Sequence, residues 1–131
     1  MTVAADTSFV IALFVDEPRS EKARTTFRRL RQTREKVYIP AQVIVEVVYV
    51  LEKFYRLERQ RVADYVRAIL STYIFIVDRE PMFIEVMEMY RKHPRINFGD
   101  LIIAADIKQR KVKKILGFDK HFEKLGLGVM S

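Results

Sequence analysis

Short apolar runs alternate with amphipathic stretches along almost the whole chain, and this alternation constrains the fold more than any other feature. Short apolar runs are typical of buried strands, whereas apolar residues at i, i+3, i+4 and i+7 are typical of helices. Strands that alternate with helices predict parallel βα units. We therefore expect an α/β fold of three layers, α/β/α, with a central, mostly parallel sheet of four to five strands.

The expected strands are short and the expected helices are longer. The strands are predicted at residues 2–5, 37–39, 74–77, 114–116 and 128–130. The helices are predicted at 8–15, from Pro18, at 40–54, at 58–71, around 83–90, and from Asp100. The chain of 131 residues shows no internal repeat and no linker, so we expect a single domain, 1–131.

Composition excludes several classes of protein. Half of the residues are hydrophobic and 31% are charged, which is typical of a globular rather than a disordered chain. The absence of cysteine excludes disulfides, thiolate zinc sites and a cysteine nucleophile, and it fits a cytoplasmic protein. No apolar run approaches the roughly 18 residues of a membrane span, so no membrane association is expected. The apolar stretch 9–15 follows an acid and lacks a basic leader, which argues against a signal peptide.

The net charge of +7 favours a polyanionic partner, because lysine and arginine release counterions from phosphates. Although the chain is basic overall, four acids lie in apolar segments near the expected junctions between strands and helices: Asp6, Glu46, Asp100 and Asp119. Ligands of open parallel sheets collect beyond the carboxyl ends of the strands, so the sequence permits all four to reach one cleft. Carboxylates in apolar company need a compensating charge, and a hard divalent cation can supply it.

Each acid also has a purely structural interpretation. Asp6, Asp100 and Asp119 can each cap the helix or turn that follows, since aspartate is a favoured N-cap residue. Glu46 lies inside a predicted helix and caps nothing. It belongs to a polar stripe that either faces solvent or borders a polar cleft, and the stripe consists of Gln42, Glu46, Tyr49 and Lys53.

The remaining polar residues suggest less chemistry. A surface ion pair explains Asp106 and Arg110, which are four residues apart on one helix face. His93 and His121 are interpreted as surface side chains rather than ligands. The chain has neither a Gly-x-Gly-x-x-Gly nor a Walker A sequence, so a glycine-rich nucleotide-binding loop is not expected.

Four segments combine these acids with a common apolar pattern. They read Ala-Asp-Thr-Ser-Phe-Val-Ile-Ala-Leu-Phe, Ile-Pro-Ala-Gln-Val-Ile-Val-Glu-Val-Val-Tyr-Val-Leu, Asn-Phe-Gly-Asp-Leu-Ile-Ile-Ala-Ala and Ile-Leu-Gly-Phe-Asp-Lys-His-Phe. In order and spacing the chain resembles the PIN-domain nucleases, and most of all the VapC-type ribonuclease toxins of prokaryotic toxin–antitoxin pairs. The resemblance matches the family's three most regular acids to Asp6, Glu46 and Asp100, its fourth acid to Asp119, and its small polar residue to Ser8. Gly117 departs from the family, which often has threonine or serine there.

This resemblance implies a metal-dependent endoribonuclease that acts on RNA, pairs with a cognate antitoxin and forms a homodimer. Mg²⁺ or Mn²⁺ suits a carboxylate set, and a bound metal would activate water for attack on a phosphodiester. Asp6 and Asp100 are expected to be the most direct ligands. Asp119 and Glu46 would bind a second ion, hold water or assist proton transfer.

Three basic residues are candidates for phosphate contacts, although each can also be a solvated surface residue: Lys53, Arg95 and Lys120. Two alternatives to the toxin remain open. One is a housekeeping RNA-processing nuclease, and the other is a non-catalytic RNA-binding or scaffold module of the same fold. Fold alone does not decide among them.

Overall fold

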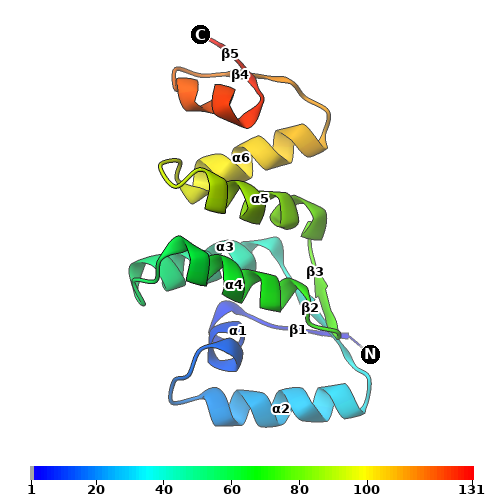
Figure 1. Cartoon of the computed structure of the whole chain (residues 1–131). Coiled ribbons are helices and arrows are strands. Elements are labelled where there is room, and N and C mark those ends of the chain that lie inside the picture. Colours follow the sequence, from blue (N-terminus) through cyan, green and yellow to red (C-terminus); the bar gives the residue numbers. More distant parts are fainter. Residues whose placement is uncertain (1) are drawn as a thin grey trace. The chain divides into compact units, whose positions relative to one another are not determined.

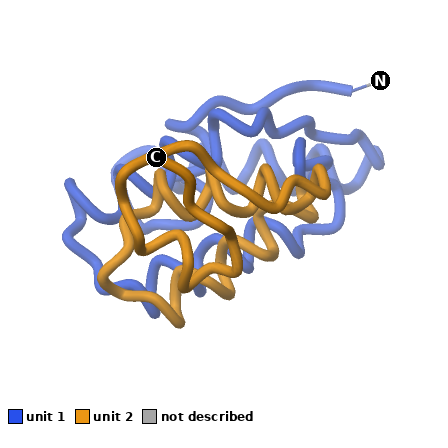
Figure 2. The backbone as a smooth tube through the Cα atoms, turned by 90° about the horizontal axis from the view of Figure 1, so that it is seen from above, with its two compact units in different colours: residues 1–79 blue, residues 80–131 orange. Residues whose placement is uncertain are grey.

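The computed structural model describes residues 2–131 of the chain. They form the element order β1-α1-α2-β2-α3-α4-β3-α5-α6-β4-η1-β5, in which η1 is a 3₁₀ helix. Contacts within the chain divide it into two compact units, residues 1–79 and residues 80–131, which Figure 2 shows in different colours. The two units are described separately below.

The first unit contains a three-stranded parallel sheet in the order β1-β2-β3 (Figure 1). The strands are β1 (Thr2–Ala4), β2 (Lys36–Ile39) and β3 (Phe75–Val77). Val37 of β2 lies opposite Val3 on one side and Phe75 on the other. Val37 and Ile39 are buried while Tyr38 is exposed. This alternation is the two-residue period expected of a sheet with one buried face.

Four helices complete the first unit: α1 (Thr7–Phe14), α2 (Ser20–Gln32), α3 (Ala41–Lys53) and α4 (Arg59–Leu70). Helix α1 packs against α2 and α3, and α3 also packs against α4. Ile44, Val48 and Leu51 of α3 follow helical spacing and are fully buried. Each such side chain contributes about 1.5–3 kcal/mol through removal of apolar surface from water. The packing of α1 on α3 therefore positions the acids that these two helices carry.

The second unit is built on two helices, α5 (Glu80–Lys92) and α6 (Phe98–Gln109), which pack against each other. The rings of Tyr90 and Phe98 meet edge to face at a centroid distance of 5.8 Å. Two short parallel strands follow, β4 (Lys114–Leu116) and β5 (Gly128–Met130), with η1 (Lys120–Leu125) between them. Among residues 2–131, no helix combines the length and the apolarity needed to cross a bilayer.

The α/β class with parallel strands is as predicted, and all five predicted strands are present within one residue of their observed bounds. Hydrogen bonds group them as the three-stranded and two-stranded sheets given above. Two predicted helix starts are wrong. The helix expected from Pro18 begins at Ser20, because the Ser20 amide donates to the Glu17 carbonyl in a preceding turn. The helix expected from Asp100 begins at Phe98, because Asn97 is its cap.

Candidate functional site

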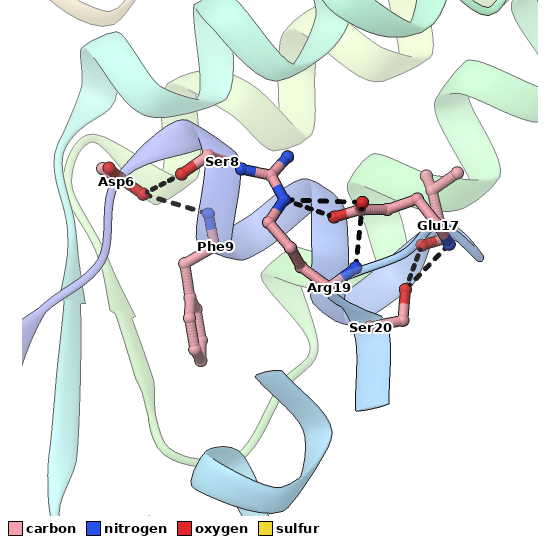
Figure 3. A network of polar contacts seen from close by, with 7 residues as sticks. Asp6, Ser8, Phe9, Glu17, Arg19 and Ser20 are labelled. Atoms are coloured by element: carbon pink, nitrogen blue, oxygen red, sulfur yellow. Dashed lines mark hydrogen bonds and ion pairs between the residues drawn. The ribbon is translucent and has the colours of Figure 1, made fainter. Parts of the chain in front are cut away.

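Asp6 is the N-cap of α1 and accepts two hydrogen bonds on Oδ1. The Phe9 amide donates at 3.0 Å and the Ser8 hydroxyl donates at 2.9 Å (Figure 3). The Phe9 bond is the largest cause that lowers the pKa of Asp6, followed by the Ser8 bond, while partial desolvation opposes them and the charge of Arg19 adds a smaller lowering. Asp6 is thus held as an exposed carboxylate at neutral pH, which is the form that binds a cation.

The turn between α1 and α2 keeps Arg19 in place. Arg19 Nε lies 3.1 Å from Oε1 of Glu17, and the Arg19 amide donates to Oε2 of the same side chain at 3.1 Å. The buried Ser20 hydroxyl accepts from the Glu17 amide and donates to the Val15 carbonyl at 2.8 Å (Figure 3). The charge of Arg19 is a minor cause of the lowered pKa of Asp6, after the two hydrogen bonds.

Glu46 lies on α3 beside the first turn of α1. The Thr7 hydroxyl donates to Glu46 Oε1 at 2.6 Å, and the Gln42 amide donates to Oε2 at 3.4 Å. Both carboxylate oxygens are therefore oriented by donors, one from each of two helices. The first unit brings Glu46 next to the residue that follows Asp6.

The polar stripe on α3 lies at the surface, as the solvent-facing interpretation predicted. Its four members, Gln42, Glu46, Tyr49 and Lys53, are all exposed. Lys53 is the last residue of the helix. Glu46 differs from a merely solvated residue because it accepts a hydrogen bond from Thr7 of α1.

In the second unit, Asp100 lies in the first turn of α6 but does not cap it, so the capping interpretation is wrong for this acid. Asn97 Oδ1 accepts from the Asp100 amide at 2.9 Å, and the Asn97 side-chain amide donates to Asp100 Oδ2 at 3.1 Å. This reciprocal arrangement resembles a capping box, in which the cap and the third helical residue bind each other. Asn97 thus positions the Asp100 carboxylate, a role that the sequence interpretation missed.

Asp119 caps η1, as its structural interpretation predicted, and accepts from the His121 amide at 3.2 Å. The His121 ring lies between two predicted site acids. Its Nδ1 is 2.8 Å from Asp119 Oδ1, and its Nε2 is 3.0 Å from Asp100 Oδ2. With a side-chain exposure of 21%, His121 is not the surface residue that the sequence interpretation made it. One sequence feature could have indicated this contact: His121 follows, by two residues, an acid that caps a tight turn.

Asp100, Asp119 and His121 offer ligand atoms that lie within 4.8 Å of one another, which is close enough to share one cation. Nε2 of His121 is buried and lies 3.0 Å from Asp100 Oδ2, while Nδ1 lies against Asp119, so each ring nitrogen contacts one carboxylate. A histidine ring held between two carboxylates can supply a nitrogen ligand to a metal that the carboxylates also bind. The donor set of this unit therefore fits a divalent metal.

The three basic candidates are all exposed: Lys53, Arg95 and Lys120. Arg95 lines a surface hollow of about 330 Å³ together with Lys92, His93 and Lys124. Lys120 is the first residue of η1, next to Asp119. Their contact with phosphate stays a prediction.

A family model described as the PIN domain matches residues 3–127, which include all four acids. The chain belongs to the PIN domain family. Among relatives, the VapC ribonuclease of Aquifex aeolicus (strain VF5) is 32% identical over 111 residues, which make up 85% of this chain and 82% of that protein. The predicted resemblance to VapC-type PIN proteins is thereby confirmed, and with it the PIN fold.

One solved structure that matches this PIN domain is the crystal structure of Mycobacterium tuberculosis VapC20, a Sarcin-Ricin loop cleaving toxin. The match covers 97% of this chain and 96% of that one, with 21% identity and a TM-score of 0.42.

Proposed function

We propose that this PIN-domain protein is a metal-dependent endoribonuclease, the toxin of a toxin–antitoxin pair, acting as one domain over residues 1–131. The similarity to the Aquifex VapC ribonuclease supports the activity. The observation that carries the metal dependence is the group formed by Asp100, Asp119 and His121, whose ligand atoms lie within 4.8 Å of one another. Four candidate carboxylates stay in their predicted roles as metal ligands and catalytic groups: Asp6, Glu46, Asp100 and Asp119.

A bound Mg²⁺ or Mn²⁺ would supply an activated water and neutralise charge that develops on the phosphodiester. The chain's own groups prepare the carboxylates for this. Ser8 and the Phe9 amide hold Asp6 ionised, Thr7 and Gln42 orient Glu46, and Asn97 orients Asp100. Such outer contacts usually matter almost as much as the ligands themselves.

An imidazole ligand from His121 would change which metal the site prefers. Carboxylates suit both Mg²⁺ and Mn²⁺, whereas imidazole is a ligand of transition metals. A ligand set that includes His121 therefore favours Mn²⁺ over Mg²⁺. Wild-type protein should bind Mn²⁺ more tightly than Mg²⁺, and titration calorimetry with each ion measures this difference directly.

The partners of this function are an RNA substrate, a cognate antitoxin and a second copy of the chain, in the cytoplasm. Lys53, Arg95 and Lys120 are the proposed phosphate contacts. Their exposure and the net charge of +7 support this role.

The decisive experiment is cleavage of a panel of structured and single-stranded RNAs by purified protein in Mg²⁺, Mn²⁺ or EDTA. Asp6→Asn and Asp100→Asn should each abolish cleavage, because each removes a proposed ligand charge. Asp106→Asn is the matched control, since Asp106 is an acid of the same helix as Asp100 that pairs with Arg110 at 3.1 Å. Cleavage that persists in EDTA, or in both ligand variants, would contradict the proposal.

The same experiment separates the alternatives. Metal-independent RNA binding without cleavage would favour the non-catalytic RNA-binding module. Cleavage by a protein whose gene has no neighbouring antitoxin gene would favour the housekeeping nuclease.

A further inference from the structure

A basic and aromatic surface of the first unit lies away from Asp6 and has no role in the proposed cleavage. We call it the Tyr73 surface, and it consists of Phe14, Phe27, Arg31, Lys36 and Tyr73. Lys36 begins β2, and Tyr73 comes shortly before β3 (Figure 1). Because the strands are parallel, their amino ends all lie on one side of the sheet, and this surface lies there. Asp6 follows the carboxyl end of β1. The Tyr73 surface and Asp6 are therefore at opposite ends of the strands of one sheet.

Tyr73 is 78% exposed, although an aromatic ring gains most from burial. The Lys36 ammonium lies over the ring, 4.9 Å from its centroid. This is cation–π geometry, and it holds the long lysine side chain beside the ring. The Lys36 ammonium thus lies over one face of the ring, and the high exposure of Tyr73 leaves the rest of the ring open to a ligand.

A hollow of about 360 Å³ adjoins the ring and is lined by Leu13, Phe14, Phe27, Arg31, Thr72 and Tyr73. Its aromatic wall is packed against the core. Phe14 and Phe27 each pack edge to face on the buried Phe75, with centroid distances of 6.2 Å and 5.9 Å. The hollow therefore presents flat apolar surface with one guanidinium among its lining groups.

Positive charge surrounds this hollow. Residues 28–36 include five arginines and lysines and a single acid, Glu35. A second hollow, of about 310 Å³, is lined by Arg28, Arg31 and Gln32, so Arg31 takes part in both. A ligand that occupied both hollows would meet aromatic surface in one and guanidinium groups in the other.

We propose that the Tyr73 surface is a second RNA-binding site, which holds an unpaired segment of RNA at the end of the sheet opposite Asp6. A base would stack on Tyr73 or enter the hollow beside Phe27, and the adjoining phosphates would contact Arg31 and Lys36. Single-strand binding combines stacking platforms with a basic track in this way. An acidic peptide without apolar side chains would use the cations but leave the aromatic surface uncovered. This inference rests on the proposed function in one respect: the proposed ribonuclease activity is the reason to expect that the bound polynucleotide is RNA.

The test is fluorescence anisotropy of a labelled single-stranded RNA with the full chain in EDTA, where cleavage is excluded. Tyr73→Ala should raise Kd about tenfold through loss of one stacked base. Arg31→Ala should raise Kd and lower the slope of log Kd against log salt by about one. Tyr73→Phe keeps the ring and should bind as wild type, which separates loss of stacking from loss of folding.

The matched controls lie in the same unit. Phe54→Ala removes a ring that is 75% exposed, and Arg61→Ala removes an exposed arginine on α4. Both should leave Kd unchanged, and the Tyr73→Ala effect should vanish on a blunt duplex of the same sequence, whose bases are already stacked. If Tyr73→Ala and Arg31→Ala bind no more weakly than the two controls, the proposal is overturned. If no metal supports cleavage but Tyr73→Ala still weakens binding, the nuclease function fails and this second site stands.

Discussion

The hydroxyl of Thr7 donates a 2.6 Å hydrogen bond to the carboxylate of Glu46, across 39 positions of sequence. The bond links the first residue of α1 to the middle of α3. This hydrogen bond connects Glu46, which lies inside α3, with the segment that carries Asp6. Several expectations follow from this contact and from its counterparts in the second unit.

Thr7→Val should lower the free energy of unfolding by about 0.5–1.5 kcal/mol, because it removes this donor while keeping the side chain's shape. Urea denaturation measures the change. Thr7→Ser is the matched control, since it keeps the hydroxyl, and it should retain most of the stability. An equal loss in both variants would mean that the methyl group, and not the hydrogen bond, is what stabilises the contact.

Stability should depend on pH through Asp6. The folded-state pKa of this carboxyl is below its ordinary value of 3.8, chiefly because of the Phe9 amide and then the Ser8 hydroxyl. The ionised group therefore contributes its full stabilisation above pH 3.8, and the contribution is lost as the pH falls through the lower folded-state value. Asp6→Asn, which keeps a capping residue, should be less stable than wild type at neutral pH and approach it in acid.

Ser8→Ala tests the cause of this shift. It removes the second donor only, so NMR titration should show an Asp6 pKa between the wild-type value and the ordinary one. An unchanged Asp6 pKa in Ser8→Ala would mean that the hydroxyl does not bind the carboxylate in solution.

Asn97 should both stabilise α6 as its cap and position the Asp100 carboxylate, and two variants separate these effects. Asn97→Ala loses the α6 cap and should cost about 1 kcal/mol in urea denaturation. Asn97→Ser still caps but lacks the side-chain amide that donates the 3.1 Å bond to Asp100 Oδ2. Serine should therefore restore most of the stability but not the metal affinity, which titration calorimetry measures. Full recovery of affinity in the serine variant would show that Asn97 does not position Asp100.

His121→Ala should weaken Mn²⁺ binding at least about tenfold, because it removes a proposed ligand. Paramagnetic resonance of free Mn²⁺ measures the affinity without any cleavage. His93→Ala is the matched control, as the chain has only these two histidines. Equal Mn²⁺ affinity in the two variants would remove His121 from the ligand set.

Two glycines should respond differently to alanine. Gly126 ends η1 with φ at 87°, a left-handed conformation that a side chain rarely adopts. Gly126→Ala should therefore destabilise the fold by about 1 kcal/mol. Gly117→Ala should be nearly neutral in thermal melting, since a Cβ there meets no atom within 4 Å. A larger loss at Gly117 than at Gly126 would contradict the geometry of this loop.

Much of the architecture was predictable because it is encoded locally. Val62, Val66 and Ile69 follow helical spacing and are all buried in α4, and β2 alternates as a half-buried strand should. Helix starts were less predictable. At α6, both Asn97 and Asp100 are favoured capping residues, and only the observed hydrogen bonds distinguish the cap from the residue it binds.

By itself, then, the sequence determined the α/β class, the five strands, the four candidate acids and the resemblance to PIN nucleases. Only the tertiary structure decided that Thr7 binds Glu46 and that the His121 ring meets the Asp100 carboxylate of α6. The physical reason is that periodicity tells which face of an element a residue occupies. The partner it meets there depends on how that element packs against others distant in sequence.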